Sequence, residues 1–154
     1  MVQSVKEPQY KPLVLSELQV GDHIVQPGAF GVQDLMHHAL FAGYYEGYPK
    51  VLHYYGNPYM YPSLFSKMSC EIRFDSINTL MRAAAAMETQ LYVQRHINPK
   101  YSGDEAVQRV IKRLGENQYN LFLNNCEHLV NWAIEDYPVP VSYTHLTLPT
   151  TPYV

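Results

Sequence analysis

The residues of this sequence that are best suited to covalent chemistry surround Cys126. An apolar run at 121–123 leads into two asparagines, the cysteine and then a helical apolar pattern. Asn124 or Asn125 can cap a helix, which predicts that Cys126 lies in its first turn. There the helix dipole and the backbone N–H groups favour a thiolate and can receive an oxyanion. Cys126 is therefore a candidate nucleophile, although cysteine is also often a small buried hydrophobe.

A thiol nucleophile needs a base, and histidines occur on two neighbouring predicted strands. His37 and His38 begin one apolar run, and His53 lies in the next. The separation of 16 positions (53 − 37 = 16), with Gly47 and Pro49 in the connection, lets His37 and His53 approach across an antiparallel pair. One imidazole can then accept the cysteine proton while a second group holds it in the required tautomer. An isolated histidine is otherwise a surface or satisfied core residue.

The strands that carry these histidines are predicted by short apolar runs that end near glycine or proline. The runs are rich in aromatic residues or alternate with charged residues, and they lie at 23–25, 39–45, 51–55 and 70–74. Together they predict an antiparallel meander.

Helical periodicity follows the strands, and polar residues mark where each helix can begin. Asp75 or Ser76 can cap the first helix, and Ser102 with Glu105 has the form of a capping box. The first predicted helix runs from the first of these caps through Leu91 and fades near 96–99. The others run from Ser102 to Gly115 and onward from about Asn125. The fold class is therefore α+β, an antiparallel sheet packed against helices.

The sequence around the candidate residues resembles the lecithin retinol acyltransferase-like family. The blocks that carry the resemblance are His37-x-Ala39-Leu40-Phe41-x-Gly43, Val51-Leu52-His53, Tyr119-Asn120-Leu121 and Asn124-Asn125-Cys126-Glu127-His128-Leu129. That family has a circularly permuted papain-like fold, in which the base precedes the nucleophile. The resemblance implies a catalytic domain at 13–137, with Cys126 as nucleophile, His37 as general base and His53 as the residue that orients it.

Other polar residues near the nucleophile are expected to be structural. His128 is predicted to point away from the thiol on its helix, and Glu127 to complete a cap with Asn124. His38 stands where the family usually has Trp or Tyr. Its side chain is expected on the opposite face of the strand from His37.

The resemblance also implies an activity and a substrate. It implies thiol-dependent acyl transfer on lipid esters, of the phospholipase A or acyltransferase type, through an acyl-thioester on Cys126. A phospholipid or other acyl ester is the implied substrate. A papain-like peptidase or amidase is the enzymatic alternative, and a module that binds membranes or proteins without catalysis is the other.

Composition argues against several other classes of protein. A net charge of −3 with scattered Lys and Arg argues against nucleic-acid binding. Two cysteines are too few for a disulfide framework, so we expect a reduced, cytoplasmic chain. Neither Cys126-x-His128 nor His37-His38 has the spacing of a metal site, and the glycines match no phosphate loop. We therefore expect no metal and no cofactor.

Two regions bear on membranes and on the domain boundary. No apolar stretch reaches the roughly 18 residues of a membrane-spanning helix. Tyrosines gather between 44 and 61, where they are either strand and loop residues or a wettable apolar surface for peripheral membrane contact. Residues 138–154 have no charged side chain apart from His145 and read partly like a translated cloning scar. We expect this tail to be unstructured.

Overall fold

The structure is a computed structural model that describes residues 9–29, 35–56, 70–117 and 125–136. Its centre is a six-stranded sheet in the order β1-β6-β2-β3-β4-β5, and neighbouring strands are antiparallel throughout. The strands are β1 (Tyr10–Pro12), β2 (His23–Pro27), β3 (Met36–Tyr45), β4 (Tyr48–Gly56), β5 (Cys70–Ser76) and β6 (Tyr92–Gln94). The predicted meander is confirmed by β2 to β5.

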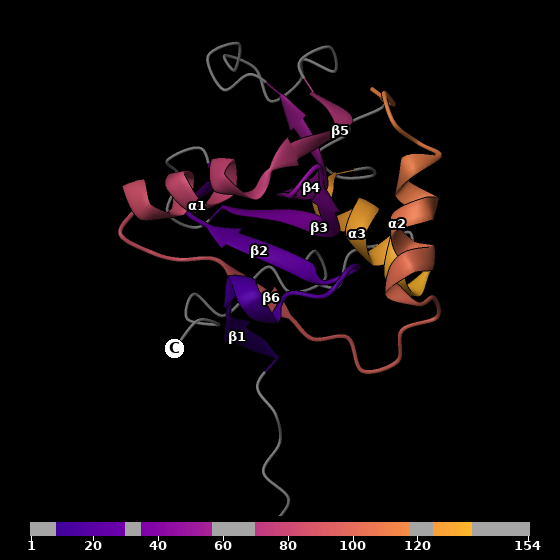
Figure 1. Ribbon diagram of the computed structural model, residues 1–154, viewed down its shortest axis with the longest axis horizontal. Helices are drawn as coiled ribbons and strands as arrows, with labels where there is room; N and C mark the ends of the chain where they lie inside the picture. The colour runs from indigo at the N-terminus through magenta and orange to yellow at the C-terminus, as the bar shows by residue number, and fades with distance from the viewer. Residues whose placement is uncertain (1–8, 30–34, 57–69, 118–124, 137–154) are drawn as a thin grey trace, which may run out of the picture.

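Helices cover both faces of this sheet. They are α1 (Ile77–Ala86), α2 (Gly103–Ile111) and α3 (Cys126–Glu135), with a short 3₁₀ turn at Leu15–Glu17. Figure 1 shows α1 on one side of the sheet and α2 with α3 on the other. The predicted α+β arrangement is therefore confirmed.

Alternation along β3 divides the core into two layers. Leu40 and Ala42 pack in the cluster that includes α2 and α3, whereas Ala39 and Phe41 pack in the cluster that includes α1. Consecutive strand residues point to opposite faces, so each face receives every second side chain. The two histidines at the start of β3 are separated by the same rule.

The first predicted helix is wrong in its second half. It ends at Ala86, and Glu88 adopts a left-handed φ of 55° that is incompatible with further helix. Leu91 is buried in the α1 cluster, but it precedes β6 and is not helical. β6 pairs with both β1 and β2 and so joins β1 to the rest of the sheet. β1 was not predicted from the sequence.

The second helix begins where its capping box predicts. The Glu105 backbone N–H donates to the Ser102 hydroxyl at 3.2 Å, and the Ser102 N–H donates to the Glu105 carboxylate at 3.2 Å. The turn before β2 lies directly against this helix start, because a Cβ on Gly103 would be 1.9 Å from the Val20 carbonyl oxygen. Only glycine permits that approach. The helix itself stops at Ile111, before the predicted Gly115.

The tail predicted at 138–154 lies outside the described residues. Among the residues that are described, no helix has the length and apolar character needed to cross a membrane.

Candidate active site

Cys126 is the first residue of α3, as predicted. Asn125 is the N-cap: its side-chain oxygen accepts the His128 backbone N–H at 3.0 Å. In return, the Asn125 N–H donates to Nδ1 of His128 at 3.1 Å. The expected cap between Glu127 and Asn124 involves a residue outside the described ranges; the N-cap of α3 is Asn125, and His128 occupies the position that completes its box. His128 has the structural role that was predicted for it.

The surroundings of the thiol differ from expectation in one respect. Cys126 is partly buried, and burial raises the pKa of its thiol to about 12. Hydrogen bonds from the backbone N–H groups of His38, Glu127 and Cys126 itself act in the opposite direction, and they do not overcome burial. The helix N-terminus alone therefore does not make a thiolate here. A nucleophilic Cys126 needs a base to remove its proton.

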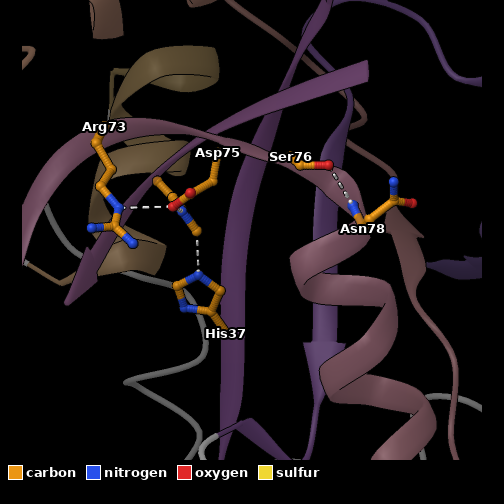
Figure 2. A network of polar contacts seen from close by, with 6 residues as sticks. His37, Arg73, Asp75, Ser76 and Asn78 are labelled. Atoms are coloured by element: carbon orange, nitrogen blue, oxygen red, sulfur yellow. Dashed lines mark hydrogen bonds and ion pairs between the residues drawn. The ribbon is translucent and has the colours of Figure 1, made fainter. Parts of the chain in front are cut away.

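The expected approach of the two histidines is observed. Nε2 of His37 lies 2.8 Å from Nδ1 of His53, and Nε2 of His53 lies 2.8 Å from a carboxylate oxygen of Asp75. Arg73 donates its Nε–H to that same oxygen at 2.8 Å. Figure 2 shows Arg73, Asp75 and His37 of this arrangement beside the first turn of α1. We call His37, His53 and Asp75 the first histidine chain.

Asp75 was missed as a site residue because it could equally cap α1. The Ser76 hydroxyl accepts the Asn78 N–H at 3.2 Å and provides that cap, which leaves Asp75 to turn toward His53. Tyr55 stacks on the His53 ring with centroids 4.9 Å apart, and the Arg73 guanidinium lies 4.7 Å from the Tyr55 ring centroid. The His53 ring is thus fixed by Tyr55 stacked on its face and by the hydrogen bonds of its two nitrogens.

Burial keeps the imidazoles of the first histidine chain neutral. It lowers the pKa of His37 well below the usual 6.5, and the neighbouring His53 acts in the same direction. Burial also lowers the pKa of His53, against the opposing effect of the Asp75 carboxylate. Burial is the largest single influence and acts to raise the pKa of Asp75, but the hydrogen bonds and charges of His53 and Arg73 together outweigh it and lower that pKa. Near pH 7 the chain therefore holds two neutral rings and a carboxylate.

The predicted site residues all border the start of β3, on two faces of the sheet: Cys126 packs on the α3 side, and the rings of His37 and His53 lie on the α1 side. His37 and His53 are in direct contact through their rings. The Cys126 sulfur receives the backbone N–H of His38, and this N–H belongs to the peptide group that links His37 to His38. The structure therefore brings the thiol to the backbone beside His37, and the His37 ring to His53.

The His38 side chain takes part in a different arrangement on the α3 face. Its Nδ1 lies 2.8 Å from Nε2 of His23, and Nδ1 of His23 lies 2.8 Å from Nε2 of His96. Carboxylates stand at both ends, with Glu135 3.2 Å from Nδ1 of His96 and Glu127 3.8 Å from Nε2 of His38. We call these five residues the second histidine chain. Burial lowers the pKa of all three imidazoles, that of His38 to about 3.

A cavity of about 640 Å³ borders the second histidine chain at His23 and His96. It lies between β2, β6 and the start of α2, and the described residues that line it include neither Cys126 nor His37. In the described ranges, no group of three or more His, Cys, Asp or Glu side chains could hold a metal ion.

Comparison with known proteins agrees with the fold. The sequence model of the family described as lecithin retinol acyltransferase matches residues 16–138. The chain belongs to this family, and its α+β fold is consistent with the papain-like architecture. Membership suggests activity of the acyltransferase or phospholipase type. Comparison with curated proteins gives no match.

Proposed function

We propose that the protein is a cysteine-dependent acyl-transfer enzyme that acts on lipid esters, with phospholipase A or acyltransferase outcomes. The observation that carries the proposal is the position of the Cys126 sulfur at the peptide group that follows His37. The His37 ring is already held by His53 through Nε2. Nδ1 is therefore the nitrogen through which His37 would take the thiol proton.

In the first step, the Cys126 sulfur attacks the ester carbonyl carbon while His37 accepts the thiol proton at Nδ1. A tetrahedral oxyanion forms. The backbone N–H groups of Cys126 and Glu127 lie in the first turn of α3, where helical partners are lacking, and they support the oxyanion. The carbon–oxygen bond then breaks, and His37 gives its proton to the departing alcohol. The product is an acyl-thioester on Cys126.

In the second step, water or an acceptor amine or alcohol attacks the thioester. His37 accepts a proton from this nucleophile, the carbon–sulfur bond breaks, and the proton returns to the Cys126 sulfur. Attack by water gives hydrolysis, and attack by an amine or alcohol gives acyl transfer. The raised pKa of the thiol, about 12, means that base and nucleophile start as a neutral pair.

A phospholipid is the substrate that family membership favours, and peripheral contact with a lipid surface goes with it. Exposed tyrosines support such contact at the β3–β4 turn: Tyr44, Tyr45 and Tyr48 are 56%, 41% and 66% exposed. Tyr45 is eight positions from His37 along β3, about 26 Å at the usual rise per residue of a strand. These tyrosines therefore support attachment of the β3–β4 turn to a lipid surface. They do not form a rim around the thiol.

The test is direct detection of the thioester. The full chain would be mixed with phosphatidylcholine micelles of one defined acyl chain, quenched in acid, and digested for mass spectrometry. We expect an acyl group on the peptide that contains Cys126, removable by hydroxylamine. Cys70→Ala is the matched control, since Cys70 is the other free cysteine and is buried on β5. It should keep the adduct, whereas Cys126→Ala should lose it.

The same assay separates the alternatives. Cleavage of a peptide amide by the thiol, with no adduct from the ester, would favour the peptidase or amidase. A folded chain that forms no adduct from ester or amide would favour the module without catalysis.

A further inference from the structure

Asp75 is the unexpected member of the first histidine chain. Its presence determines which ring nitrogen of each histidine carries the proton. An ionised carboxylate can only accept hydrogen bonds. Because the Asp75 oxygen lies 2.8 Å from Nε2 of His53, that nitrogen must carry the His53 proton. A neutral imidazole has one N–H, so Nδ1 of His53 is an acceptor. The contact with His37 can then be made only if His37 donates.

The same reasoning assigns the tautomer of His37. Its Nε2 lies 2.8 Å from the acceptor Nδ1 of His53, so Nε2 of His37 carries the proton. Nδ1 of His37 is then unprotonated, which is the form in which an imidazole can accept a proton from a thiol. The opposite tautomer would present an N–H to the thiol and could not act as its base.

Arg73 prevents the arrangement from reversing. It donates to the same Asp75 oxygen that faces His53, and a carboxylic acid group with its proton on that oxygen would be repelled there. His53 is fully buried at 0% exposure, so water does not compete for its ring. Geometry alone thus keeps Asp75 as the acceptor at the end of the chain.

We propose that Asp75, held by Arg73, is a positioning residue that fixes the tautomer of His37 through His53. Asp75 touches no reacting atom in this scheme. The proposal rests on the proposed function, because the tautomer matters only if His37 serves the thiol.

The test combines a tautomer measurement with a rate. In full chain labelled with ¹⁵N-histidine, the ring nitrogens of His37 would be assigned by comparison with His37→Gln. We expect the wild type to show His37 protonated at Nε2. Asp75→Ala should give a mixture of tautomers, and its single-turnover acylation rate should fall about 10²-fold. That is less than the roughly 10⁴-fold loss when the group that touches the base is changed in a comparable triad.

Two variants give the proposal its controls. Asp75→Asn can still present an amide oxygen to His53 and Arg73, so it should retain the tautomer and most of the rate. Glu71→Gln removes a carboxylate from an exposed position of the same strand and should change neither. Circular dichroism of each variant confirms folding before the rates are compared.

The outcomes separate this inference from the proposed function. A wild-type His37 protonated at Nδ1, or an Asp75→Ala chain with an unchanged tautomer, overturns the role of Asp75 even if the thioester forms. A wild type with the expected tautomer but no thioester overturns the proposed function and supports the proton direction that Asp75 imposes.

Discussion

Two histidine chains lie on opposite faces of β3, and they differ in what stands at their ends. The first has the Asp75 carboxylate at one end and Nδ1 of His37 at the other. The second has a carboxylate at each end, Glu127 and Glu135. Because carboxylates only accept hydrogen bonds, the ends determine whether a chain of neutral imidazoles can satisfy every contact.

The first chain satisfies its contacts with the protons that it has. It contains two imidazoles and two hydrogen-bonded contacts, so each ring donates once and Nδ1 of His37 carries no proton. The second chain contains three imidazoles and four contacts. Three neutral rings supply only three protons, so one contact must join two acceptors.

The distances identify the contact that lacks a proton. The His96–Glu135 contact is 3.2 Å and the two contacts between rings are 2.8 Å, all within hydrogen-bonding distance. The His38–Glu127 contact is 3.8 Å, which is too long. Donation in the second chain therefore runs toward Glu135 and leaves the Nε2 lone pair of His38 facing the Glu127 carboxylate.

This difference suggests a division of labour between adjacent residues. His37 ends a chain that leaves its Nδ1 without a proton, and the proposed function uses this nitrogen as the base. His38 ends a chain whose open lone pair faces a carboxylate that repels it. The first arrangement suits a base, and the second suits a structural link between β2, β3, the segment at His96 and α3.

The largest effect on the acylation rate should come from replacing His37 and His53, one at a time, with alanine. His37→Ala should reduce the single-turnover acylation rate of Cys126 by about 10³-fold, because general-base catalysis contributes on the order of 10²–10⁴. His53→Ala should reduce it less, since the base remains while its orientation is lost. The rates would be measured by quenched-flow detection of the thioester.

His38→Ala is the matched variant for that series. Its acylation rate should stay within a few-fold of wild type, while the free energy of unfolding falls by about 1–3 kcal/mol because buried His23 loses a partner. If His38→Ala abolishes the thioester and His37→Ala does not, the base is His38, and the comparison of the two chains is reversed.

Local sequence signals predicted much of the frame that positions these chains. The Ser102–Glu105 capping box and the asparagines before Cys126 mark helix starts through contacts within four residues, so they can be read from the sequence. The spacing of His37 and His53 across a tight connection could be read in the same way.

The remaining features depend on contacts that no local pattern records. β6 was read as the end of a helix, because its strand character comes from pairing with β1 and β2. His23 and His96 are 73 positions apart, and only the completed sheet brings their rings together. The choice between Asp75 and Ser76 as the cap likewise depends on His53, 22 positions earlier. Burial of the thiol, which reversed its expected pKa shift, is also a property of the assembled layers.

The next effect is a loss of stability in acid, to which both chains contribute. Burial lowers the pKa of the imidazoles at positions 23, 37, 38, 53 and 96, so the folded protein keeps them neutral. The unfolded chain binds protons there below pH about 6.5. The free energy of unfolding should therefore fall as the pH drops below that value, by up to about 1.4 kcal/mol per pH unit for each histidine.

Urea unfolding between pH 7 and pH 5 would measure this slope. His23→Gln removes one buried ring from the second chain, so its slope should be smaller by about one proton. A wild-type slope of zero would mean that the folded protein already holds protons on these rings, and the proton count of both chains would be wrong.

The smallest effect tests the direction of hydrogen-bond donation in the second chain. Replacing Glu127 or Glu135 with glutamine should change the free energy of unfolding in opposite directions. Glu127→Gln offers an N–H to the lone pair of His38 and supplies the missing proton. Glu135→Gln removes the charge that accepts from His96. The hydrogen bond gained in Glu127→Gln should raise the free energy of unfolding by about 1 kcal/mol, and the bond weakened in Glu135→Gln should lower it by about the same amount. Reversed signs would mean that donation runs toward Glu127.

The helix dipole opposes both changes and must be subtracted. Glu127 lies in the first turn of α3, where a negative charge is favourable, and Glu135 lies at its end, where it is unfavourable. Each effect is about 0.3–1 kcal/mol, similar in size to the hydrogen bond. Repeating Glu127→Gln in a His38→Ala chain, and Glu135→Gln in a His96→Ala chain, cancels the dipole contribution in a double-mutant cycle. The interaction should make Glu127→Gln more favourable when His38 is present, and Glu135→Gln less favourable when His96 is present.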